Sequence, residues 1–199
     1  MNVKIDALTV GPVQTNCYIV YLEGQGQAVI IDPGAEGEKI REALGDKTPA
    51  AILLTHGHFD HTGALKDFPG VPIYIHPADE IMLEDPSWHA GAMIGDSAPR
   101  PAATHFVQEG ARLRLADMDI QVMHLPGHSL GSVAYLIGDA LFSGDTLFAR
   151  GYGRTDLPGG NMADEIRSLQ RLLKMDKNWI VLPGHGDPTT LDAEREYFL

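Results

Sequence analysis

The chain has 199 residues, which is enough for one sizeable hydrophobic core and too few for two domains with a linker, so we expect a single domain over residues 1–199. Acidic residues outnumber basic ones by 27 to 15, and the formal net charge of −12 argues against nucleic acid or an anionic membrane as a partner. No apolar run approaches the roughly 20 residues of a membrane span, and the first residues lack the pattern of a secretory signal. We therefore expect a cytoplasmic location.

The first half of the chain alternates between strand-like runs and short helical patterns. Three runs at the start, separated by turns that contain glycine, predict antiparallel strands. The single cysteine, Cys17, lies in the second run, where we expect a buried structural thiol. The predicted strands are residues 3–10, 16–22, 27–32, 50–54 and 71–75, and the predicted helices are residues 37–44 and 61–68, with another starting at Pro77.

The second half is mostly strand. Residues 84–105 show no clean period and are expected to form a loop over a site, with Trp88 and Met93 as candidates to line it. Predicted strands cover residues 112–115, 119–125, 132–137, 140–143 and 179–182, and a helix covers residues 163–174. Because the strands fall into two groups, each followed by helices, the sequence predicts an α/β fold with two sheets face to face and helices outside.

Four potential metal ligands follow the strand predicted at residues 50–54: His56, His58, Asp60 and His61. If the backbone is still extended there, His56 and His58 point to the same side and can share one ion. Asp60 is expected to be the N-cap of the next helix, which would aim Asp60 and His61 back at the strand end. Imidazole and carboxylate ligands suit zinc, iron and manganese, and no thiolate lies beside them.

The order of apolar strand, glycine-containing turn and ligand recurs three times in the second half, at His128, Asp145 and His185. Strand ends are where a rigid scaffold presents functional groups, so these side chains can meet the first cluster. His124 and His128 flank the same turn, and the spacing does not choose between them. With one of these two, seven side chains are available, which suits two ions with three private ligands each and one shared carboxylate.

Four motifs resemble those of the metallo-β-lactamase-fold hydrolases, and within them the glyoxalase II-like branch. They are Thr-His-Gly-His-Phe-Asp-His at residues 55–61, Leu-Pro-Gly-His-Ser at 125–129, Phe-Ser-Gly-Asp-Thr-Leu-Phe at 142–148 and Leu-Pro-Gly-His-Gly at 182–186. The similarity runs over nearly the whole chain and includes the Gly-Tyr-Gly-Arg-Thr-Asp run that starts at residue 151. It implies a four-layer αββα sandwich.

The resemblance also implies which residues bind metal, and it favours His128 over His124. His56, His58 and His128 would hold one ion, Asp60, His61 and His185 the other, and Asp145 would bridge the two. Two zinc ions are the first expectation, with iron, manganese or a mixed pair as alternatives. Asp60 and Asp145 would orient a bridging hydroxide that attacks a thioester such as S-D-lactoylglutathione, a small-molecule substrate.

Arg154 matches the basic residue of the branch's Gly-x-Gly-Lys/Arg motif and is the expected substrate-binding cation. Asp156, two positions on, stands where the branch has an aromatic anchor. We expect a short form of the branch without the C-terminal helical segment that supplies further basic residues to glutathione, so the thiol carrier stays open. The family's β-lactamases usually vary at the position of His61 and use cysteine near that of Asp145, which disfavours a β-lactam substrate.

Three other functions stay open. Persulfide dioxygenases resemble this branch and carry the same ligand residues with a single iron, whereas the Pro-Gly-His-Gly turn at residues 183–186 favours the hydrolases. The acidic composition disfavours a phosphodiesterase or nuclease of the same fold. A non-catalytic metal-stabilised module is disfavoured because all seven ligand positions are filled. His76 also follows a predicted strand, but it has no second ligand nearby, and a structural or capping role is expected.

Overall fold

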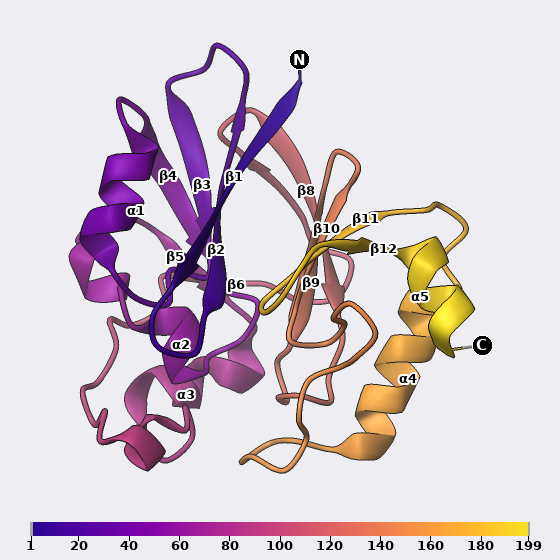
Figure 1. The fold of residues 1–199 in the computed structure, drawn as a ribbon. Helices are drawn as coiled ribbons and strands as arrows, with labels where there is room; N and C mark the ends of the chain where they lie inside the picture. The colour runs from indigo at the N-terminus through magenta and orange to yellow at the C-terminus, as the bar shows by residue number, and fades with distance from the viewer. Residues whose placement is uncertain (1, 199) are drawn as a thin grey trace.

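The computed structural model describes residues 2–198, and the first half of the chain forms one six-stranded sheet (Figure 1). The first three strands pair antiparallel, and the later ones pair in parallel, so the strands lie in the sheet in their chain order. The strands are β1 (Val3–Val10), β2 (Thr15–Leu22), β3 (Gln27–Ile31), β4 (Thr48–Leu53), β5 (Ile73–Ile75) and β6 (His105–Phe106).

The second half forms a second six-stranded sheet, in the order β12-β11-β10-β9-β8-β7. All its neighbours pair antiparallel except β10 and β11, which run in parallel. The strands are β7 (Arg112–Leu115), β8 (Met118–His124), β9 (Val133–Ile137), β10 (Ala140–Gly144), β11 (Ile180–Pro183) and β12 (Thr189–Thr190).

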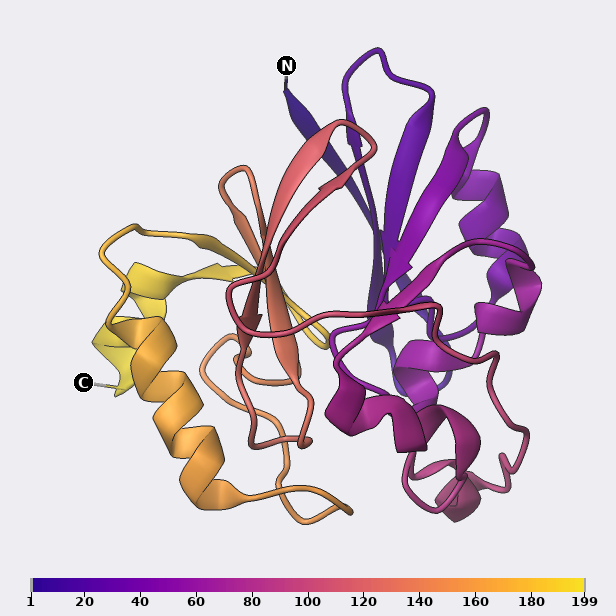
Figure 2. The ribbon, with the colours of Figure 1, turned by 180° about the vertical axis from the view of Figure 1, so that it is seen from behind.

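The helices cover the outer faces of the two sheets (Figures 1 and 2). On the first sheet lie α1 (Gly37–Leu44), α2 (Phe59–Thr62) and α3 (Glu80–Glu84), with 3-10 turns at Leu65–Asp67, Pro77–Asp79 and Gly91–Ile94, and on the second lie α4 (Met162–Leu173) and α5 (Leu191–Phe198). The four-layer αββα sandwich predicted from the sequence is confirmed. Within the described residues, none of these helices has the length and apolar character needed to cross a membrane.

The layers are held together by apolar side chains that alternate along the strands. In β2, Val20 joins the core between the sheets, whereas Ile19 joins the cluster beneath α1. In β10, Phe142 faces the other sheet and Leu141 faces α4 and α5. Full burial of each such side chain contributes about 1.5–3 kcal/mol, so the strand ends that carry the site are rigidly supported. The thiol of Cys17 is fully buried, as expected.

The prediction for the helix at residues 61–68 was wrong in its start and in its continuity. Helix α2 begins at Phe59 with His58 at the N-cap position, so Asp60 lies in the first turn instead of capping it. The helix ends early because Ala64 donates its backbone N–H to the carbonyl of Pro33. The chain then re-enters a 3-10 turn at Leu65. A long-range contact with the loop after β3 thus overrides the local helical pattern.

Candidate metal centre

The seven predicted ligands meet at one edge of the sandwich. Because β10 and β11 are parallel neighbours, the loops that follow them leave from the same edge, and Gly184 donates its N–H to the carbonyl of Gly144 at 2.8 Å. A Cβ on Gly184 would lie 2.2 Å from Asp145 Oδ1 and 2.7 Å from His61 Cε1. Only glycine fits at this position, and its absence of a side chain lets the ligands close on one another.

Three imidazoles form one half of the centre. His58 turns Nδ1 inward and His56 and His128 turn Nε2 inward. The His58 Nδ1 to His128 Nε2 distance is 2.8 Å, and the His128 Nε2 to His56 Nε2 distance is 3.2 Å. Ligand nitrogens on one tetrahedral zinc ion lie about 3.3 Å apart. The three rings are therefore arranged as ligands of a single ion would be.

Carboxylates enter the second half of the centre. Asp60 Oδ2 lies 3.1 Å from His185 Nε2 and 3.4 Å from His61 Nε2. Asp145 lies between the halves, with Oδ1 3.3 Å from His61 Nε2 and Oδ2 3.5 Å from both His128 Nε2 and His185 Nε2. The carboxylate that was predicted to bridge thus touches ligands of both groups.

The donor set fits metal ions better than it fits hydrogen bonds. His61 Nε2 and Asp145 Oδ1 are buried and make no hydrogen bond with any residue between 2 and 198. Buried polar atoms without partners are uncommon because they cost free energy. His56, His58 and His128, and separately Asp60, His61 and His185, have ligand atoms within 4.8 Å of one another. These residues suit two divalent cations, and the role of each as a ligand stays a prediction.

The two halves differ in their proton affinity. Burial, reinforced by the neighbouring rings, lowers the pKa of His56 well below its ordinary value, and burial lowers that of His58 to about 3. Burial also acts to lower the pKa of His61, but Asp60, Asp145 and Asp32 outweigh it and raise that pKa. His56 and His58 are thus neutral nitrogen donors, which is the form that binds metal.

Several residues that the sequence reasoning had not singled out hold these ligands. Asp32 accepts hydrogen bonds from the backbone N–H and the hydroxyl of Thr55, at 2.8 and 2.7 Å, and its Oδ2 lies 3.0 Å from His61 Nδ1. The Thr55 hydroxyl oxygen lies 3.1 Å from His56 Nδ1. Because that hydroxyl proton goes to Asp32, His56 Nδ1 is the donor and its Nε2 keeps a free lone pair.

Two further contacts orient ligands from outside the cluster. Thr15 donates its hydroxyl to Asp60 Oδ2 at 2.8 Å, and His128 Nδ1 donates to the backbone carbonyl of Arg154 at 2.7 Å. The second contact fixes the tautomer of His128, so that Nε2 faces the cluster. The signal for Asp32 was available in its position at the end of a buried strand, but its contacts with residues after β4 depend on the sheet.

His124 and His76 lie outside the cluster and stack on each other with ring centroids 4.1 Å apart. His124 Nε2 donates to the carbonyl of Leu130, and His76 Nδ1 accepts the backbone N–H of Ala78. The capping role expected for His76 is confirmed.

Arg154 reaches the rim of the cluster but its charge is engaged. Its guanidinium donates two hydrogen bonds to Asp156, from Nε to Oδ1 at 2.7 Å and from Nη2 to Oδ2 at 2.8 Å. Both side chains are exposed. The position of the predicted substrate-binding cation is therefore occupied by a bidentate ion pair.

A hollow of about 380 Å³ opens over the ligands. Its floor includes His58, Asp60, His128, Asp145 and His185, and most of its walls are apolar. Met93 lines it, as the sequence suggested, whereas Trp88 approaches Gly159 instead. The volume is of the size that holds a small organic substrate.

Comparison with known proteins gives the family. Residues 10–185 match the Metallo-beta-lactamase superfamily, and this chain belongs to it. A probable metallo-hydrolase of Bacillus subtilis, YqgX, is 39% identical, and the match covers 95% of this chain and 93% of the relative. The hydroxyacylglutathione hydrolase GloC of Haemophilus influenzae is 34% identical over 98% of this chain and 95% of its own length.

Two crystal structures are similar over almost their full lengths. BLEG-1, a B3 metallo-β-lactamase, superposes with a TM-score of 0.90 at 36% identity, covering 97% of each chain. TTHA1623, in a di-iron-bound form, gives a TM-score of 0.84 at 41% identity, with 95% of this chain and 96% of that chain covered. The protein is thus a metallo-hydrolase of the superfamily with a site compatible with divalent metal binding.

Proposed function

We propose that the protein is a binuclear thioester hydrolase of the glyoxalase II type. The observation that carries this proposal is the complete set of histidine and carboxylate donors, with Asp145 between the two halves. The likeness to a hydroxyacylglutathione hydrolase over nearly the whole chain supports the thioester class. His56, His58 and His128 would hold one ion, Asp60, His61 and His185 the other, and Asp145 would serve both.

The reaction adds water to the thioester carbonyl, breaks the C–S bond and gives a carboxylic acid and a thiol. Divalent ions bound here would supply Lewis acidity, which polarises the carbonyl and lowers the pKa of the attacking water. The protein supplies orientation. Asp60, fixed by the Thr15 hydroxyl, offers a carboxylate oxygen that can accept a proton from that water. The apolar walls of the hollow reduce competing hydration around the reacting group.

Zinc is the first candidate for the native metal, and iron is a second because TTHA1623 holds two irons. Iron bound in this chain would also support the alternative function, that of a persulfide dioxygenase. A nuclease or phosphodiesterase has less support because of the net charge of −12. The BLEG-1 likeness makes β-lactam hydrolysis a necessary control.

The test combines elemental analysis with three assays on protein purified without added metal. Thioester hydrolysis, oxygen uptake with a persulfide and hydrolysis of a chromogenic cephalosporin are measured on the same preparation. Two ions per chain with thioester hydrolysis would support the proposal. One iron with oxygen uptake would replace it by the dioxygenase, and cephalosporin hydrolysis without thioester hydrolysis would replace it by a β-lactamase.

A further inference from the structure

The walls of the hollow over the metal ligands are apolar. Val13, Met93 and Ile94 line it although 44%, 69% and 57% of their surfaces are exposed. The apolar lining is completed by Phe59, Ala90, Phe148 and Leu157. Exposed apolar side chains gathered around a site indicate a ligand that covers them.

Among residues 2–198, Arg154 is the single Lys or Arg that lines this hollow, and Asp156 engages it with two hydrogen bonds. The guanidinium holds the pKa of the Asp156 carboxyl at about 2, so the pair stays ionised over the physiological range. An anionic substrate group that approached Arg154 would have to displace Asp156 or lie beside its carboxylate. The rim therefore offers little net attraction to an anion.

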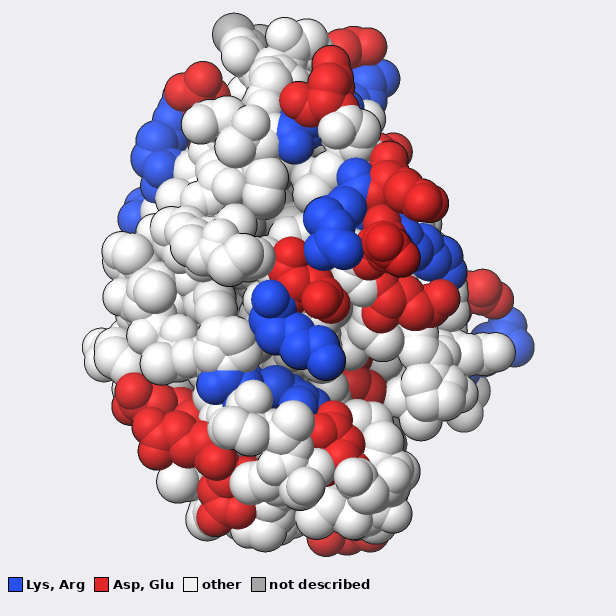
Figure 3. Space-filling model, turned by 90° about the vertical axis from the view of Figure 1, so that its left-hand side faces the viewer, with Lys and Arg blue, Asp and Glu red and all other residues white. Residues whose placement is uncertain are grey.

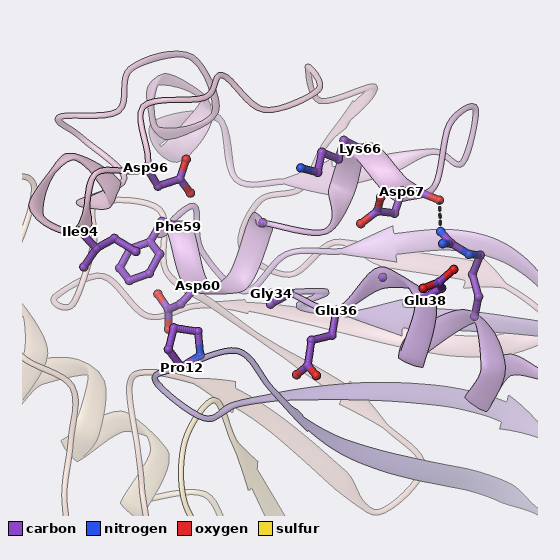
Figure 4. Close-up of a pocket in the computed structure, with 14 residues that line it drawn as sticks. Pro12, Gly34, Glu36, Glu38, Phe59, Asp60, Lys66, Asp67, Ile94 and Asp96 are labelled. Carbon is purple, nitrogen blue, oxygen red and sulfur yellow. Dashed lines mark hydrogen bonds between the residues drawn. The ribbon is translucent and has the colours of Figure 1, made fainter.

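The neighbouring hollow offers no anion site either. It adjoins the first at Phe59, Asp60 and Ile94, which Figure 4 shows at one end of the cleft. Figure 3 shows basic and acidic side chains interleaved on the side of the molecule that is at the left in Figure 1. Apart from Asp60, four acidic side chains and two basic ones from the described part of the chain line this neighbouring hollow. The acidic residues are Glu36, Glu38, Asp67 and Asp96, and the basic residues are Arg41 and Lys66. Among these lining residues carboxylates outnumber cations, and the nearby cations Arg100 and Lys39 are already paired with Asp96 and Glu36.

We propose that the site selects thioesters whose acyl group and adjoining thiol arm are apolar and uncharged, and that Asp156 enforces this by occupying Arg154. The inference rests on the proposed thioester hydrolysis and narrows its substrate class. It makes Asp156 a specificity-determining residue that acts through Arg154. A glutathione thioester, which carries carboxylates, becomes a poor substrate compared with a neutral one of the same acyl group.

The first experiment measures kcat/KM of the metal-loaded protein on two D-lactoyl thioesters, one of glutathione and one of neutral N-acetylcysteamine. The wild type is expected to prefer the neutral thioester. Asp156→Asn should shift the ratio toward glutathione by about three- to fivefold, because it frees an exposed guanidinium to pair with a carboxylate. High salt should reverse that shift. The double variant R154M/D156N should lose it, and Asp156→Ser provides a second replacement of the same carboxylate.

The second experiment tests the apolar walls with N-acetylcysteamine thioesters of two-, four- and six-carbon acyl groups. In the wild type, kcat/KM should rise with chain length. Met93→Gln should flatten that rise, whereas Met162→Gln, a matched change of an exposed methionine at the start of α4, should leave it in place.

The outcomes separate this inference from the proposed function. Absence of hydrolysis of every thioester by metal-loaded protein would overturn the proposed function itself. Hydrolysis with a preference for the glutathione thioester, or an unchanged ratio in both Asp156 variants, would overturn the inference alone. A flat chain-length series in the wild type would also overturn it.

Discussion

The two halves of the centre use different chemistry to hold their side chains. The half made by His56, His58 and His128 contains only imidazoles, and burial holds the pKa values of His56 and His58 low. In the other half, carboxylates raise the pKa of His61, and His185 pairs with Asp60 at 3.1 Å. In the second half, carboxylates beside the imidazoles offset part of the cost of burial, although His61 Nε2 still makes no hydrogen bond with a described residue. The first half presents lone pairs to one another and depends on a cation to relieve them.

The largest expected effect follows from removing the metals. Exhaustive chelation should abolish hydrolysis and lower the free energy of unfolding by about 5–8 kcal/mol, or about 3–4 kcal/mol per ion, relative to protein with free metal at 100 to 1,000 times the dissociation constant of each of two independent sites. The effect should be reversible, because the scaffold's core does not involve the ligands. Thermal unfolding with and without chelator, followed by readdition of metal, measures it. An unchanged melting temperature would mean that neither half depends on a cation.

Asp32→Asn should weaken metal binding in both halves of the centre at once. It removes the charge beside His61 and weakens the acceptor that orders Thr55, which in turn orients His56. We expect metal affinity to fall by roughly 10- to 100-fold, which is typical for residues that orient ligands. Competition with a metallochromic chelator reports this change. Thr15→Val, which removes only the hydrogen bond to Asp60, should weaken a single site; equal losses at both sites in that variant would contradict the division into halves.

The stacked pair His76 and His124 lies outside both halves of the centre and should affect the pH dependence of stability. Burial, and then the neighbouring His124, lowers the pKa of His76 from 6.5 to about 4, so the unfolded chain binds more protons than the native one between these values. Unfolding free energy should therefore decrease as the pH falls from 6.5 toward 4. Because His76 is only half-buried, we expect His76→Gln to reduce this decrease by about 1 kcal/mol, measured by denaturant unfolding of metal-free protein. A decrease of the same size in both proteins would contradict the assignment.

His124→Ala should have the smallest effect on metal binding. His124 flanks the same turn as His128, but its ring bonds to the carbonyl of Leu130 instead of the cluster. Metal content by elemental analysis should stay near that of the wild type, whereas His128→Ala should lose an ion from the first half. A loss of metal in the His124 variant would mean that the ligand set is misassigned.

The sequence predicted the metal ligands better than it predicted the residues that orient them. The ligands follow apolar strands with glycine-containing turns, a local pattern, and the structure brings all seven side chains together. The role of Asp32 depends on the parallel register of β3 and β4, which places residues 23 positions apart in contact. The early end of the helix predicted at residues 61–68 has a similar origin, since a long-range backbone contact between Ala64 and Pro33 decides where α2 ends.

The rim of the site was the least predictable part. The family resemblance predicted Arg154 as the substrate-binding cation. Its partner Asp156 lies two residues on, in an irregular loop where no periodicity fixes which side chains meet. The apolar lining combines Val13, Ile94 and Leu157, which come from segments far apart in the chain. Only the packed sandwich places them over one hollow.

The central claim is that Asp145 joins the two halves into a two-ion centre, and metal stoichiometry of Asp145→Ala tests it most directly. The carboxylate lies within 3.5 Å of ligand nitrogens from both groups, so its removal should weaken both ions and abolish hydrolysis. His61→Ala, which removes a ligand from one half, should retain the other ion. Elemental analysis of gel-filtered protein is predicted to give two ions per chain for the wild type and less than one for Asp145→Ala. Two ions per chain retained by Asp145→Ala would contradict the account.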